Sequence, residues 1–363
     1  MSPANPSTLR LERRGLGLAA AFGLVGAAVA CLTPAWISLA YRLAVFACLT
    51  PSIGCLVLVL IHRITGGQWA ADLAPFLRAG ASLLPWIWLF AFPLLVLSPA
   101  LGGPTHAARA SWAYDGVPMV AVRAVVYAGL FFGLRWATAD GMGLERQPAR
   151  NPRPWVGPVG LIVLFFLLTL LADDWLESLE PGWHSTAFPV VWIAGGVVFA
   201  LALALLAGLW SGARPEVEGG ARRALGLDWG NLLLASMVFW AYVSFAQFLI
   251  IWAGNLPEET SWYLRREHGL WKCLVPAVAI FGFALPFFLL LSRRLKTTAS
   301  GLAWVSALLV ASQLVYTAWV ILPAGGRPSV GALVLAGSFL AGGAGIYGSR
   351  GLRAARLLTE AAS

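Results

Sequence analysis

Apolar runs long enough to cross a hydrocarbon core of roughly 30 Å recur from one end of this 363-residue chain to the other. Each run ends in glycine, proline or charged residues, which is typical of a spanning helix that meets water. Hydrophobic residues make up 59% of the chain and charged residues only 11%, far from the mixed surface of a soluble domain. The sequence therefore predicts an all-α integral membrane protein with about ten transmembrane helices. The predicted spans have the approximate cores Leu16–Cys31, Ile37–Ile61, Leu83–Leu97, Val117–Phe132, Val156–Leu171, Phe188–Leu209, Leu232–Trp252, Cys273–Leu291, Leu302–Leu322 and Val330–Tyr347.

These spans leave no room for a soluble domain, because the longest gaps between them are about 20 residues, too short to form a core. We therefore expect residues 1–363 to form one polytopic domain with short cytoplasmic tails at 1–14 and 349–363. The first span follows a basic stretch but lacks a clear A-x-A cleavage site, so it is interpreted as a retained helix and not as a signal peptide.

The net charge of +9 follows the membrane and does not indicate a nucleic-acid partner. With the N-terminus inside, eighteen of the 25 basic residues fall in the inner gaps and the two tails. This asymmetry is what the positive-inside rule predicts, so both termini are expected to be cytoplasmic. The outer gaps hold only Arg109, Arg265, Arg266, Lys272 and Arg327.

Residues that carry redox or metal chemistry are few. The cysteines lie in or at the edge of apolar spans without metal-ligand spacing, which indicates packing. A bundle that binds b-type haem needs axial ligands at depth on facing helices, and every histidine lies at a span end or in a gap. No phosphate-binding loop, zinc motif or nucleophile elbow occurs, so we expect no catalytic, cofactor-binding or metal-binding residue in this chain. The residues concerned are Cys31, Cys48, Cys55, Cys273, His62, His106, His184 and His268.

The stretch SFAQFLIIWAGNLPEETSWYLRR begins as an apolar helix and becomes highly charged. Gln247 lies about two turns below the outer exit, where an amide facing lipid is costly. It makes either an interhelical hydrogen bond or part of a proton or quinone route. The charges beyond the proline form either a solvated loop or a docking surface at the entrance of a polar cavity. This outer segment contains Asn255, Glu258, Glu259, Arg265 and Arg266.

Arg42 and Arg123 lie one or two turns inside the outer ends of their spans, at a cost of roughly 2.5 to 3.5 kcal/mol each if unpaired at full depth. The outer stretch DDWLESLEPGWHST supplies acids without a basic residue. We therefore predict pairing among Arg42, Arg123, Asp174 and Glu258. The candidate subunit-docking residues are Asp173, Asp174, Trp183, Arg265 and Arg266.

A proton path through the span that ends near Trp252 has few titratable groups. Asp228 and Asn231 lie at its inner end and Gln247 in its outer half, and the stretch between Asn231 and Gln247 is largely apolar over about 24 Å. A conducting route needs help from other spans, through Gln313, Tyr316, Tyr127 or water. The candidate polar-path residues are Asp228, Gln247, Asn255, Glu258, Glu259, Arg123 and Arg42.

Two motifs resemble those of the ActF subunits of alternative complex III, a bacterial quinol:cytochrome c oxidoreductase. The first is a D-W-x-x-S-L-x-P-x-W-x-S-T string, matched here from Asp174 to Thr186, and the second is the stretch from Gln247 to Thr260. Weaker similarities occur in TGGQW at 65–69 and at Arg123. This chain is short for the family and reads DDWLESLE where a methionine is more usual before the serine.

The resemblance implies an NrfD-like fold of ten helices, with two four-helix bundles and two further helices, in the bacterial cytoplasmic membrane. It also implies a cofactor-free subunit with a suspected part in proton movement. Partner subunits then carry haem c and iron-sulfur clusters on the outer face, the related ActC subunit is associated with quinol oxidation, and the quinol pool and lipids surround the complex.

Two other functions are consistent with the sequence. The chain itself binds quinol if aromatic residues line a pocket beside a proton acceptor such as Glu259 or Asp174. A stand-alone secondary transporter is the third hypothesis, but no internal repeat or polar midplane site indicates one. The aromatic residues considered for the quinol pocket are Trp86, Trp88, Trp240 and Trp252.

Overall fold

In the computed structural model most of the described residues are helical, short turns and connections make up the rest, and no strand occurs among them. These residues are 34–67, 69–70, 73–88, 91, 117–139, 153–180, 182–210, 219–325 and 337. Six segments within them are long and apolar enough to cross a membrane: Leu39–Thr65, Val156–Leu179, Phe188–Trp210, Leu225–Gly254, Trp271–Leu291 and Ala299–Gly325. The prediction of an all-α chain is therefore confirmed for the described residues, and six of its helices are suited to crossing a membrane, whereas the predicted number of ten is not reached among these residues.

Five of the predicted spans form single long helices that contain, or nearly contain, their predicted cores. Each end falls where the apolar run gives way to polar, glycine or proline residues, as expected for a helix leaving the hydrocarbon. The predicted span at 16–31 lies outside the described residues, as does the span at 330–347 apart from Gly337. The five helices are α2 (Pro34–Thr65), α7 (Val156–Trp175), α8 (Phe188–Trp210), α9 (Gly219–Gly254) and α14 (Ala299–Ile321).

The predicted span 273–291 is helical throughout but changes its hydrogen-bond pattern midway. It consists of α11 (Trp271–Ala279), the π-helix η2 (Ile280–Ala284) and α12 (Leu285–Leu291). Pro286 has no N–H, so the Gly282 carbonyl lacks its α-helical donor, and the Leu285 N–H bonds to the Ile280 carbonyl.

Two further helices flank the centre. α3 (Ala74–Ser82) precedes the predicted third span, of which the structure describes only the first residues, in a helical turn at 84–88. α6 (Val117–Ala139) covers the fourth predicted span and continues beyond it. It is not among the six segments named above.

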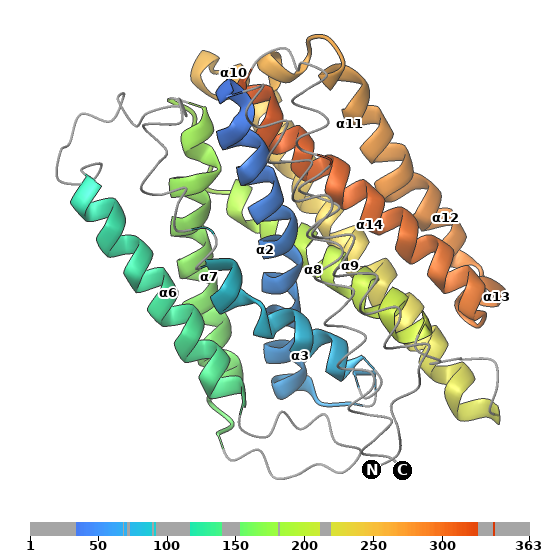
Figure 1. Cartoon of the computed structure of the whole chain (residues 1–363). Helices are drawn as coiled ribbons and strands as arrows, with labels where there is room; N and C mark the ends of the chain where they lie inside the picture. The colour runs from blue at the N-terminus through green and yellow to red at the C-terminus, as the bar shows by residue number, and fades with distance from the viewer. Residues whose placement is uncertain are drawn as a thin grey trace.

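α2 and α8 pack against each other along the middle of the bundle, with α3, α7, α9 and α14 around them (Figure 1). The two helices approach closely because glycines face each other at the crossing. A Cβ added to Gly54 would lie within bonding range of the Gly196 carbonyl, and one added to Gly196 would lie 2.9 Å from the Thr50 carbonyl. Small residues that let backbones approach are typical of helix pairs in membranes.

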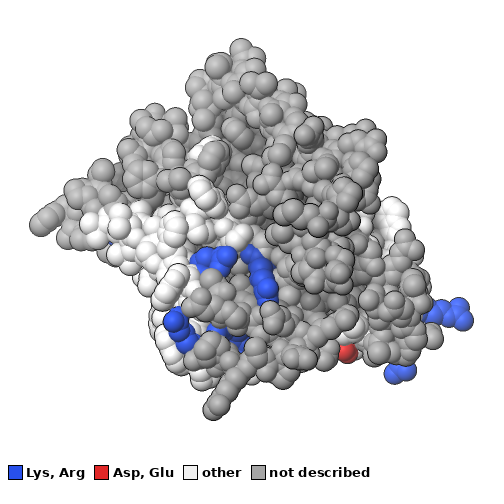
Figure 2. All heavy atoms as spheres, turned by 60° about the horizontal axis from the view of Figure 1, so that its bottom comes forward, with Lys and Arg blue, Asp and Glu red and all other residues white. Residues whose placement is uncertain are grey.

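The bundle has two chemically different ends, which we name after the short helices that lie there. α10 (Pro257–Arg266) follows α9 at one end, and α13 (Arg293–Lys296) follows α12 at the other (Figure 1). Figure 2 turns the α13 end toward the viewer, and its coloured residues are mostly Lys and Arg. This distribution agrees with a cytoplasmic α13 end, as the charge asymmetry predicts, and leaves the acid-rich α10 end for the outer side.

Candidate functional site

The α10 end places a buried carboxylate between an arginine and a tyrosine. Asp174 Oδ2 accepts hydrogen bonds from Arg123 Nε at 3.0 Å and from the Tyr127 hydroxyl at 2.6 Å. Asp174 lies at the end of α7, and both donors come from α6, one helical turn apart. The predicted pair of Arg123 and Asp174 is present, and it fastens α6 to α7 where their charges would otherwise meet hydrocarbon.

Arg42 of α2 reaches the same turn of α7 by a different contact. Its NH1 donates to the Trp175 carbonyl at 2.8 Å, next to Asp174 in the chain. The fourth predicted member, Glu258, is exposed on α10 and does not take part in these contacts. Three of the four predicted residues therefore meet at the end of α7, where Arg123 pairs with the Asp174 carboxylate and Arg42 bonds to a carbonyl of the helix C-terminus.

A second charged cluster joins α10 to the segment after α7. Glu180 Oε1 lies 2.7 Å from Arg265 NH2, and its other oxygen lies 4.0 Å from Arg266 NH1. Burial raises the pKa of Glu180, and the two guanidinium groups act in the opposite direction. The sequence analysis did not predict this pairing, although both partners lie in stretches that it singled out.

Arg266 is only 2% exposed and is held by groups that suit a guanidinium. Its nitrogens donate to the carbonyls of Trp262, Trp319 and Val320 at 2.7 to 3.2 Å. The guanidinium also lies 3.7 Å from the centre of the Trp262 ring, a cation–π contact. Burial lowers the pKa of Arg266 to about 9, so the group remains charged at neutral pH. These contacts tie α10 to the end of α14.

The two stretches that carry the resemblance touch each other directly. Trp183 is fully buried, stacks on Trp262 with ring centroids 5.1 Å apart, and donates its indole N–H to the Glu259 carbonyl at 3.0 Å. Gln247 Nε2 donates to Ser185 Oγ at 3.2 Å. Gln247 therefore makes a hydrogen bond within the chain, as one of the two hypotheses predicted, but its acceptor lies in the segment before α8 and not in another helix. Segments 62 to 76 residues apart in the chain form one structural unit.

The remaining candidate residues are spread over the two ends. Asn255 ends α9 in the left-handed region, with φ of 48°, and so turns the chain into α10. Glu258 is exposed on α10, whereas Asp228 is exposed near the α13 end. Because Trp183 and Arg266 are buried, they position α10 from beneath. A partner arriving at this end can touch Asp173, Glu258 and Arg265 directly.

One cluster at this end combines residue types that bind metals. Ligand atoms of Asp173, Glu177 and His184 all lie within 4.8 Å of one another. Carboxylates with an imidazole are a donor set that divalent metals such as zinc accept. Internal contacts also account for the cluster, because His184 Nδ1 lies 3.5 Å from Asp173 and Glu177 accepts the Ser185 N–H at 3.0 Å. Asp173 lies in the last turn of α7 and Glu177 begins the short 3-10 helix Glu177–Leu179 that follows, a spacing of four residues that the sequence analysis did not use.

No protein-family model and no curated protein sequence matches this chain. The arrangement at the α10 end therefore has to be interpreted from its own chemistry. It offers a rigid, charged and partly aromatic platform above a helical bundle. Its buried charges are engaged within the chain, and its exposed ones surround α10.

Proposed function

We propose that this chain is a cofactor-free membrane subunit of a bacterial respiratory quinol:electron-acceptor oxidoreductase of the alternative complex III type. In this assignment it has ten transmembrane helices in an NrfD-like arrangement of two four-helix bundles and two further helices. It lies in the cytoplasmic membrane with both termini in the cytoplasm. Partner subunits with haem c and iron-sulfur clusters dock at the α10 end, and the ActC-like subunit lies beside it in the membrane.

The observation that carries this proposal is the direct contact between the two ActF-like stretches. Residues that match the first motif, Trp183 and Ser185, bond to residues of the second, Glu259 and Gln247. The two motifs are distant in sequence, and their direct contact gives one structural explanation for the occurrence of both in this chain. The resemblance thus concerns a defined part of the molecule and not merely its hydrophobic composition.

The proposed part in proton translocation rests on polar groups at both ends of α9. Asp228 is exposed near the α13 end, and Gln247 is bonded to Ser185 near the α10 end. The helix between them is largely apolar, so a continuous route requires groups from α14 or bound water.

Purification of the tagged chain from its native membrane in mild detergent tests the assignment. We expect subunits that stain for haem on a gel, together with an iron-sulfur protein and a second large membrane subunit identified by mass spectrometry. Purification of the chain alone, under conditions that keep a known respiratory complex of the same membrane intact, would contradict the proposal and favour a transporter.

The docking face is tested by charge reversal on α10. Glu258→Lys changes an exposed residue, so it should reduce the yield of haem-bearing partners without unfolding the chain. Asp228→Lys is the matched control at the opposite end and should leave this yield unchanged. Equal yields of haem-bearing partners from the two variants would mean that the docking face does not include α10.

A further inference from the structure

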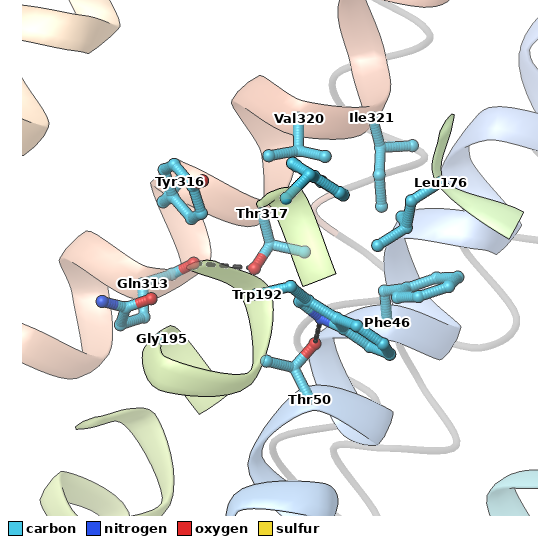
Figure 3. Close-up of a pocket in the computed structure, with 11 residues that line it drawn as sticks. Phe46, Thr50, Leu176, Trp192, Gly195, Gln313, Tyr316, Thr317, Val320 and Ile321 are labelled. Atoms are coloured by element: carbon cyan, nitrogen blue, oxygen red, sulfur yellow. Dashed lines mark hydrogen bonds between the residues drawn. The ribbon is translucent and has the colours of Figure 1, made fainter. Parts of the chain in front are cut away.

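A small cavity lies between α2, α8 and α14, within the membrane-spanning part of the bundle (Figure 3). Gln313 on its wall lies eight residues before Ile321, which is about 12 Å along the helix at 1.5 Å per residue. The cavity leaves about 10 Å³ for the centre of a water molecule, which is enough for one. Its polar lining consists of Thr50, Gln313, Tyr316 and Thr317.

Gln313 brings an unmet hydrogen-bonding group to this cavity. Its side chain is 1% exposed, and its Nε2 has no hydrogen-bond partner among the residues that the structure describes. The nearby Trp240 is 3% exposed, and its Nε1 is likewise without a partner in the described part of the chain. Buried donors without acceptors are rare, because each loses its bonds to water and gains none in return.

These two side chains converge on one point of α8. A Cβ added to Gly195 would lie 3.1 Å from Gln313 Oε1 and 3.1 Å from Trp240 Nε1. Figure 3 shows the Gln313 side-chain amide beside Gly195. It also shows the Thr317 hydroxyl donating to the backbone carbonyl of Gln313, and the Trp192 indole N–H donating to the Thr50 hydroxyl. Glycine at position 195 therefore leaves space beside polar atoms from both α9 and α14.

The π-helix borders the same region from the other side. A Cβ added to Gly282 would lie 3.0 Å from Ser312 Oγ and 3.6 Å from the Trp240 ring. Pro286 removes the α-helical donor of the Gly282 carbonyl. π-Helical turns within α-helices occur frequently at functional sites.

We propose that the cavity between α2, α8 and α14 binds an internal water molecule, with the Gln313 amide as its principal ligand. The Trp240 indole, which lies beside the lining residue Gly195, is a second donor. A buried water needs two to four polar partners, and the amide, the indole and the threonine hydroxyls supply them. Larger occupants do not fit, because pockets that hold drug-sized ligands or cofactors measure roughly 300 to 1,000 Å³. The cavity thus selects water over a quinol head group.

This water would contribute to the proton route of the proposed function, and that role rests on the proposed function. Trp240 lies in the apolar stretch of α9 between Asn231 and Gln247, where the chain itself offers few groups that carry protons. The two proposals fail separately. Hydration is measured on this chain alone, whereas the respiratory assignment is measured by the haem-bearing partners that purify with it.

X-ray hydroxyl-radical labelling of the full-length chain in H₂¹⁸O tests the water site, with ¹⁸O incorporation read by mass spectrometry. Radicals formed from a bound water oxidise the side chains beside it. We expect Trp240 to be labelled several times more than Trp183, which is at least as buried but donates its indole N–H to Glu259. Equal labelling of the two tryptophans would overturn the proposal.

Two substitutions and one control sharpen this test. Gln313→Leu removes the amide, and Gly195→Ala places a methyl group against both polar atoms, so each should reduce Trp240 labelling to the level of Trp183. Gln247→Leu is the matched control, because its amide already bonds to Ser185, and it should leave Trp240 labelling unchanged. Unaltered Trp183 labelling in each variant verifies the fold. Persistence of Trp240 labelling in Gln313→Leu would remove Gln313 as the ligand.

Discussion

The α10 end and the α13 end of the bundle treat charge in opposite ways. At the α10 end, Asp174 and Arg266 are buried and contact residues from other helices that are distant in the sequence. At the α13 end, Arg293 and Arg294 are exposed, and the buried Lys296 donates to Asn231 of the neighbouring helix at 2.6 Å. Charge at the α10 end holds segments together, whereas charge at the α13 end mainly faces water.

The largest expected effect is a difference in thiol labelling between the two ends, because they face opposite sides of the membrane. Glu258→Cys and Arg294→Cys place thiols on exposed positions of opposite ends. A membrane-impermeant thiol reagent should label the first only from outside the cell and the second only from inside inverted vesicles, because the basic end stays in the cytoplasm. The wild-type chain measures the background from its own cysteines. Labelling of Glu258→Cys from the cytoplasmic side would reverse the proposed orientation.

Removal of the buried guanidinium should give the largest loss of stability. Arg266→Gln breaks three bonds to carbonyls and leaves buried Glu180 with a single close cation, so we expect a loss of about 3 to 5 kcal/mol in the free energy of unfolding. Denaturant titration in mixed micelles measures this value. Arg294→Gln, at the exposed end, should change it by less than about 0.5 kcal/mol. Similar losses for both variants would erase the contrast between the ends.

A smaller effect is expected at the carboxylate that joins α6 to α7. Asp174→Asn keeps an acceptor for Tyr127 but removes the charge opposite Arg123, which should cost about 1.5 to 3 kcal/mol. Asp228→Asn makes the same chemical change on an exposed residue and should be nearly neutral. The same titration compares the two. A neutral result for Asp174→Asn would mean that the ion pair contributes no net stability.

The smallest predicted effect is a pH dependence at Glu180. Burial raises the folded-state pKa of Glu180 above its ordinary value of 4.5. The folded chain then binds this proton more tightly than the unfolded chain. The resulting stability is present below about pH 4.5 and is lost as the pH rises through the folded pKa.

The difference in unfolding free energy between the wild type and Glu180→Gln should therefore fall over that window. Because Arg265 lowers this pKa, Arg265→Gln should move the window to higher pH. A difference that grows with pH would mean that the arginines outweigh burial at this site.

The spanning helices could be predicted from the sequence because length and hydropathy are local properties. α8 begins at Phe188 as predicted and ends one residue beyond the predicted core. The contacts of the site are not local. Arg42 meets the Trp175 carbonyl across 133 residues, and the Glu180–Arg265 pair depends on how α10 folds back over the end of α7.

Some features of the site left a local signal that the sequence analysis passed over. The prolines at 276 and 286 within one apolar span indicate an irregular helix, and Pro286 lies two residues after the end of the π-helix. The unmet amide of Gln313 has no such signal. The sequence does not distinguish a buried glutamine that hydrogen-bonds to a protein group from one that hydrogen-bonds to a water molecule.

The contact between α10 and α14 constrains the order in which the chain folds during synthesis. Arg266 bonds to the carbonyl of Val320, 54 residues later in the sequence. During synthesis this arginine therefore emerges long before its acceptors exist and must wait in water until α14 has entered the membrane. The contact between α10 and α14 can therefore form only late in folding. In a stalled or truncated chain that lacks α14, α10 would stay unpacked and accessible to quality-control proteases.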